Sequence, residues 1–155
     1  MPLFNPPAAA AGGGTWPVLI ASMQGANGAA VQSITGQTFA TLNVNATTDS
    51  HTGFNATTDA YTIPAGQSGT YQINMKMRPV DANAGGSSYG IGCDTTNGDS
   101  ASFFWGLTNA TGRHGLANAR TVDLAAGAAL KVFSYFDKVG SIGIYSAELI
   151  IYRIR

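Results

Sequence analysis

The segment Thr70–Arg78 constrains the fold most, because apolar and polar side chains alternate along its whole length. A repeat of two residues is that of a β-strand with one face buried and the other in water. Pro79 follows at once, and proline cannot donate the backbone hydrogen bond that would continue a central strand. The pattern therefore predicts a strand whose apolar face belongs to the core, made of Tyr71, Ile73, Met75 and Met77.

Two later segments, Leu130–Phe136 and Ile144–Tyr152, carry apolar residues on both faces of the strands that they predict. Strands of this kind are covered on both sides. The sequence offers no amphipathic helix as a cover, since the Ala-rich region Ala117–Ala129 is interrupted by Gly127 and is strand-like at Thr121–Leu124. We therefore expect another subunit to cover one face, with an interface that includes Phe133, Tyr135, Ile150 and Tyr152.

Glycine-rich turns separate the predicted strands, and a weaker strand is expected over Phe39–Asn45. The pentapeptide Asn45–Asp49 recurs as Asn55–Asp59, which we interpret as similar turn chemistry on both sides of a loop around Gly53. Many short strands with turns between them are typical of a β-sandwich or barrel. The length of 155 residues fits one such domain.

The N-terminal region is neutral, and no charged side chain precedes Asp49. Because exposed surface normally carries charge, such a region is either a flexible tail or is covered by sister subunits or a larger assembly. Residues 1–14 combine prolines with an Ala- and Gly-rich stretch, so we expect a separate arm ahead of a head domain over residues 15–155. The arm lacks the basic residues of a secretory signal. We expect it to anchor the protein to a partner through Leu3, Phe4, Pro6 and Pro7.

The charge balance and the single cysteine exclude several classes of protein. Eight basic and eight acidic side chains give a net charge of zero, so a general electrostatic grip on nucleic acid or on anionic membranes is not expected. The apolar runs are far shorter than the ~20 residues that span a bilayer, so we expect no membrane insertion. Cys93 has no second cysteine with which to form an intrachain disulfide.

The sequence contains no recognisable catalytic motif, so we expect no enzyme activity and no cofactor. Cys93 and His114 could in principle act as nucleophile and base, but a small buried cysteine and a loop histidine are the more ordinary interpretation. A polar turn with Asp94, Asn97 and Asp99 offers oxygen ligands of the type that calcium prefers, without the closing glutamate of an EF-hand. We interpret it as a turn between strands and expect no metal.

Two other features carry weaker alternatives. Asp49, His51 and Asp59 lie around the repeated loop and form a second metal candidate. Phe103–Trp105 is an aromatic cluster whose ordinary role is packing in a core or an interface. An exposed ring in that cluster, beside Asn and Asp, would instead stack on a sugar.

Three segments carry a family resemblance. They are Phe39–Pro64, then Gly69–Ile73 with its Gly-x-Tyr-x-hydrophobic step, and then Val122–Val132 followed by the closing run Leu149–Ile154. In this order they resemble the C1q/tumour-necrosis-factor-like jelly roll, in the form seen in bacteriophage structural proteins. The resemblance covers roughly residues 38–154. The family often has an acid after the glycine of the third segment, where this chain has Ala128.

The resemblance implies an antiparallel, all-β jelly-roll sandwich, a homotrimer around a three-fold axis, and no catalysis. An arm ahead of a compact head is similar to phage decoration, head-fibre and tail-tip proteins. We therefore expect a virion structural protein, displayed on the particle surface and attached by its arm to other virion proteins of the capsid or tail. The alternative is a minor tail or tail-tip protein that recognises a host-surface glycan.

Overall fold

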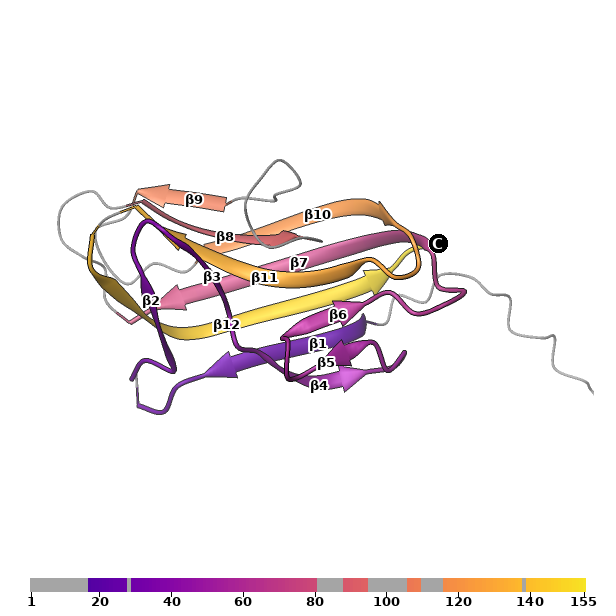
Figure 1. Ribbon diagram of the computed structural model, residues 1–155, viewed down its shortest axis with the longest axis horizontal. Coiled ribbons are helices and arrows are strands. Elements are labelled where there is room, and N and C mark those ends of the chain that lie inside the picture. The colour runs from indigo at the N-terminus through magenta and orange to yellow at the C-terminus, as the bar shows by residue number, and fades with distance from the viewer. Residues whose placement is uncertain (1–16, 28, 81–87, 95–105, 110–115, 138) are drawn as a thin grey trace, which may run out of the picture.

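The computed structural model describes residues 17–27, 29–80, 88–94, 106–109, 116–137 and 139–155. All the regular structure in these residues is β, in two six-stranded antiparallel sheets that enclose one core (Figure 1). Within the same residues, no helix has the length and apolar character needed to cross a membrane.

The first sheet contains both the first and the last strand of the described chain. Its strands follow the spatial order β10, β7, β12, β1 and β4, and the short strand β2 also pairs with β12. Their bounds are β10 (Leu116–Leu124), β7 (Gly69–Pro79), β12 (Ser141–Arg153), β1 (Pro17–Gln24), β4 (Asn45–Asp49) and β2 (Gln32–Thr35).

The second sheet is built around β11. Its strands follow the order β5, β6, β11, β8 and β9, and β3 also pairs with β11. Their bounds are β5 (Phe54–Asn55), β6 (Ala60–Thr62), β11 (Ala129–Phe136), β8 (Ser88–Asp94), β9 (Gly106–Asn109) and β3 (Phe39–Thr41). Sequence neighbours often lie in different sheets, as a jelly roll requires.

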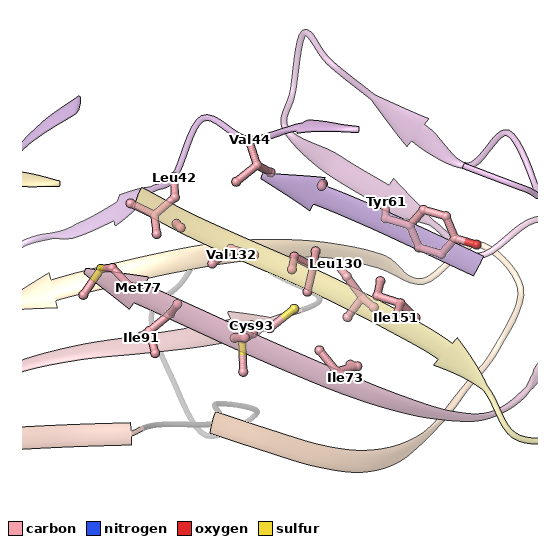
Figure 2. Close-up of a cluster of buried hydrophobic side chains, with 14 of the residues drawn as sticks. Leu42, Val44, Tyr61, Ile73, Met77, Ile91, Cys93, Leu130, Val132 and Ile151 are labelled. Atoms are coloured by element: carbon pink, nitrogen blue, oxygen red, sulfur yellow. The ribbon is translucent and has the colours of Figure 1, made fainter. Parts of the chain in front are cut away.

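The core fills the space between the two sheets (Figure 2). From β7 it receives the four side chains expected from the alternating pattern, each no more than 2% exposed: Tyr71, Ile73, Met75 and Met77. From β12 it receives Leu149 and Ile151, and from the facing sheet Leu130, Val132 and Cys93. The alternation in sequence therefore corresponds to the inner and outer faces of the first sheet.

The strand expected over Phe39–Asn45 is wrong in one respect, because the chain there forms two strands in different sheets. β3 pairs with β11 of the second sheet, and β4 pairs with β1 of the first. Between them, the Leu42 amide donates to the Val132 carbonyl, and both Leu42 and Val44 are buried in the core. Leu42 and Val44 are both buried because the chain passes from one sheet to the other here and their side chains enter the core between the sheets.

The repeated pentapeptide also differs from its interpretation as similar turn chemistry. The first copy, Asn45–Asp49, is the edge strand β4, whereas most of the second, Asn55–Asp59, is a turn. In the second copy, Asn55 accepts hydrogen bonds from the Thr57 amide on its side-chain oxygen and from the Thr58 amide on its backbone oxygen. Identical residues therefore adopt two structures, because the first copy pairs with β1 along its length, whereas only Asn55 of the second copy pairs with a strand.

The start of β1 and the end of β12 lie at the same end of the sandwich, since Pro17 pairs with Tyr152 (Figure 1). The turn between β11 and β12 lies at the other end, where the Gly36 amide donates to the Gly140 carbonyl. Because residues 1–16 precede Pro17 directly, they join the domain at the first of these ends.

Candidate subunit interface

The outward face of the first sheet has no covering layer among the described residues. Cross-strand pairing arranges its side chains in rows across four strands. The central row contains Ile20, Ile150, Asn74 and Ala119, from β1, β12, β7 and β10 respectively. The next row contains Ser22, Glu148, Lys76 and Ala117.

A hollow of about 530 Å³ lies on this face. Its borders are polar side chains of β7, Glu148 and Ile150 of β12, and the alanines Ala117 and Ala119 of β10. Because an alanine projects only one carbon from the sheet, β10 leaves room beside the longer side chains of β7. The hollow is therefore a consequence of small residues on the edge strand next to large ones.

An ion pair crosses the hollow's border. Lys76 Nζ lies 2.8 Å from Glu148 Oε1, and the two side chains are 63% and 23% exposed. Surface pairs of this kind contribute about 0–1 kcal/mol to stability. The pair has a larger effect on the charge of this face than on stability. It neutralises Lys76, so the surface beside Ile150 carries no net charge.

Sequence analysis expected four interface residues, and the structure places them on two different faces. Ile150 and Tyr152 lie on the outward face of the first sheet and are partly exposed. Phe133 and Tyr135 lie on β11 in the second sheet. Phe133 is only 3% exposed within the single chain, so it has almost no surface left for a contact with another subunit.

Tyr135 forms part of an aromatic contact on the second sheet. Its ring lies 5.0 Å, centroid to centroid, from that of Phe39 at an angle of 37°. Phe39 is 43% exposed. Tilted aromatic pairs at this separation are favourable beyond the area that they bury. The contact stabilises the pairing of β3 with β11.

Other candidate residues lie outside the described residues. These are the anchoring residues Leu3, Phe4, Pro6 and Pro7, the histidine His114, the aromatic run Phe103–Trp105, and Asn97 and Asp99. Asp94 ends β8, but its side chain is likewise not described. Cys93, in contrast, is fully buried in the core, where a thiol behaves as a small apolar side chain.

The loop around Gly53 is held by a carboxylate rather than organised around a metal. Asp49 accepts hydrogen bonds from the backbone amides of Gly53, at 3.0 Å, and Phe54, at 2.8 Å. Among the residues that the structure describes, no group of three or more His, Cys, Asp or Glu side chains is placed to hold a metal ion. Asp49 therefore acts as a loop cap, with His51 and Asp59 nearby in sequence.

Two titratable groups beside this loop are perturbed by burial. Burial raises the pKa of the Tyr61 hydroxyl, and the Tyr71 hydroxyl and the Asp49 carboxylate add to the effect. Burial also raises the pKa of Asp59, against the opposing attraction of Lys131. The Tyr61 hydroxyl has no hydrogen-bond partner within the described part of the chain. These shifts are costs of packing the loop against the core.

Sequence reasoning missed the hollow and its alanines. Ala117 and Ala119 stand in a segment that looked too irregular for a helix, and β10 was expected only at Thr121–Leu124. A usable signal was present, because Ala117, Ala119 and Thr121 recur with period two.

Comparisons with known proteins support the fold. Neither a protein-family model nor the sequence of a curated protein matches this chain. Among solved structures, PRD1 vertex protein P5 is similar at a TM-score of 0.64 and 16% identity, over 90% of this chain and 99% of that one. The globular domain of zebrafish complement 1qA protein is similar at 0.54 and 13% identity, over 90% and 98%. Murine APRIL is similar at 0.58 and 8% identity, over 86% and 98%.

The chain therefore has the C1q/TNF-like jelly-roll fold, and the expected fold class is confirmed. The two-sheet architecture and the strand order place the long strands β7, β12 and β1 in one sheet, and β11 and β8 in the other.

Proposed function

We propose that this protein is a structural component of a phage virion, a trimeric head that its N-terminal arm attaches to the particle surface. The observation that carries the proposal is the likeness to PRD1 vertex protein P5, whose chain is matched over 99% of its length. That neighbour is a virion protein. A capsid decoration or head-fibre role fits the arm and head organisation best.

The trimer is supported by the outward face of the first sheet. A cyclic assembly joins two different patches of neighbouring subunits. The row around Ile150 and the hollow beside Ala119 supply an apolar ridge and a recess on one face. The resemblance to the C1q/TNF-like jelly roll implies a trimer as well. In this arrangement Ile150 and Tyr152 face a neighbouring subunit, and Phe133 remains inside its own.

The arm is the proposed attachment element. Residues 1–14 carry no charge, and their apolar side chains Leu3 and Phe4 stand among three prolines. Burying each in a groove of another virion protein would contribute ~1.5–3 kcal/mol. Prolines reduce the conformational entropy that the arm loses on docking. Three arms on one trimer would act together and raise avidity by ~10²–10⁴ where all three sites are within reach.

Deletion of residues 1–14 tests the attachment. We expect the truncated protein to keep its melting temperature and its oligomeric mass, and to be missing from purified particles. The matched control replaces Leu3 and Phe4 with serine and leaves the arm's length unchanged. Normal occupancy of particles by the truncated protein would show that the head itself makes the attachment.

The second candidate is a tail or tail-tip protein that binds a host-surface glycan. Both candidates have the same fold and the same arm. They differ in the function of the end of the sandwich opposite Pro17, which in the second candidate contacts the host surface. Imaging of the labelled protein on purified particles separates the two, because a decoration protein lies on the capsid and a tail-tip protein lies on the tail. Enzyme activity is not proposed, since the similar solved structures are structural or cytokine-like proteins.

A further inference from the structure

A β-bulge in β12 turns one aromatic side chain out of the first sheet. The register between β12 and β7 shifts between Ile144 and Ser146, so Tyr145 is an extra residue in its strand. Bulges of this kind re-aim a side chain. Ile144 and Ala147 on either side remain buried in the core, whereas Tyr145 is partly exposed.

The Tyr145 ring is covered by an arginine. The guanidinium carbon of Arg78 lies 5.2 Å from the centroid of the ring, within the range of a cation–π contact. The Tyr145 hydroxyl in turn lies 3.5 Å from the side-chain nitrogen of Gln24, which donates to it. The contact restrains the guanidinium beside the Tyr145 ring before any ligand arrives.

Arg78 is exposed, and among the described residues no carboxylate lies within ion-pair distance of it. Lys76, two residues earlier on the same face, has its charge neutralised by Glu148. The two cations of β7 therefore differ, because among the described residues only Lys76 has a carboxylate partner. Arg78 lies on the same outward face, one row beyond the Lys76–Glu148 row, and does not border the hollow.

We propose that Arg78, stacked on Tyr145, is a binding site for the anionic group of an acidic saccharide. A guanidinium offers two parallel N–H donors that match the two oxygens of a carboxylate or a phosphate. The Gln24 amide, the Tyr145 hydroxyl and the Ser146 hydroxyl stand beside it as neutral groups for sugar hydroxyls. The site binds through charge and fixed geometry rather than through an apolar pocket.

The position of the site fits a surface turned away from the particle. Gln24 and Arg78 both pair with Ser146, whereas Pro17 at the other end of β1 pairs with Tyr152. Seven residues of strand separate Pro17 from Gln24, which corresponds to about 23 Å. This orientation rests on the proposed attachment through the arm, whereas the binding chemistry does not.

Titration of the purified chain with glucuronic acid, glucose 6-phosphate and glucose, followed by NMR, tests the site. We expect the two acidic sugars to shift the resonances of Arg78 and Tyr145 and uncharged glucose to leave them unchanged. The stronger of the two acids identifies the natural anion as a carboxylate or a phosphate. Added salt should weaken the binding, because the site is exposed. No particle is involved, so failure of the arm proposal leaves this result intact.

Substitutions give the decisive comparison. Arg78→Gln should weaken binding about tenfold or more, as expected for loss of a charge-assisted hydrogen bond. Arg155→Gln removes the same charge at the opposite end of the sandwich and should leave binding unchanged. Tyr145→Leu removes the stacking ring and should weaken binding, whereas Tyr145→Phe keeps the ring and should bind nearly as well.

Three results would overturn the proposal. Equal binding by the wild type and Arg78→Gln would remove the guanidinium from the site. Glucose that binds as well as glucuronic acid would remove the anion. A change in oligomeric mass on Arg78→Gln would show that Arg78 pairs with a neighbouring subunit rather than with a saccharide.

Discussion

Two adjacent isoleucines of β12 allow a direct test of the subunit interface. Ile151 points into the core and is fully buried, whereas Ile150 lies on the outward face and is partly exposed. Replacing each with alanine removes the same atoms from opposite faces of one strand. Ile151→Ala should therefore change folding of the protomer, and Ile150→Ala should change assembly.

The two substitutions affect different free energies, that of folding for Ile151→Ala and that of subunit association for Ile150→Ala. Ile151→Ala leaves a cavity in a close-packed core and should cost about 2–5 kcal/mol of folding stability. Full burial of an isoleucine side chain is worth about 1.5–3 kcal/mol. Since Ile150 is already partly buried in the single chain, at most about a third of that, ~0.5–1 kcal/mol, remains to be gained in the interface. Three subunits lose it together, so the trimer dissociation constant should rise by up to roughly 10- to 150-fold.

Sedimentation equilibrium over a range of protein concentrations measures the assembly. We expect the wild type to approach three times the 15.9 kDa of one chain, and Ile150→Ala to dissociate at higher concentration than the wild type. Urea unfolding of the same two variants measures folding and should show the larger effect for Ile151→Ala. A wild type that stays at the mass of one chain, or an Ile150→Ala trimer as tight as the wild type, would refute this interface.

Three other predictions concern buried side chains. Ile73→Asp should prevent folding, because an uncompensated buried charge costs several kcal/mol, whereas Asn74→Asp on the outward face should fold; soluble expression and circular dichroism compare them. Tyr61→Phe should keep or raise the melting temperature, since the buried hydroxyl that it removes has no partner among the described residues, and a clear loss would reveal one. Burial raises the pKa of Asp59, so its contribution to stability is full below the ordinary value of 3.8 and is lost as pH rises through the folded-state value. Asp59→Asn should therefore flatten the dependence of unfolding free energy on pH across the acidic range, and an unchanged curve would contradict this.

Alternation along the chain was sufficient to predict β7, because its period of two is unbroken from Thr70 to Arg78. For β12 the same rule fails at one residue. A strict period of two places Tyr145 on the same face as Ala147, and the bulge places it on the other. A bulge depends on how a neighbouring strand pairs, and a single strand's sequence carries little trace of it. The Arg78 stack was therefore not predictable from the sequence.

The strands with two apolar faces show a second limit. Leu130–Phe136 and Ile144–Tyr152 have similar patterns, and both were expected to contact another subunit. In the fold, the outward residue Phe133 is covered within its own chain, whereas Ile150 remains partly exposed. The pattern of apolar residues predicts that both faces of a strand are covered, but it does not predict whether the cover is the same chain or another subunit. The difference lies in long-range contacts that local sequence does not encode.

The proposed subunit contact and the Arg78 site share the outward face of the first sheet, but the Arg78 site lies at the end of that face away from Pro17. If the strands of this sheet run along the three-fold axis, the three starts of β1 lie at one end of the trimer and the three Arg78 sites lie at the other. An exposed guanidinium binds a single acidic sugar weakly, because its charge is screened by salt. Three such sites on one head engage a repeating polysaccharide together, and linkage of this kind raises avidity by ~10²–10⁴ where the spacing permits. A weak site is thus sufficient on a trimer, and Ile150→Ala should lower avidity for an acidic polysaccharide while leaving the affinity of each Arg78 site for glucuronic acid unchanged.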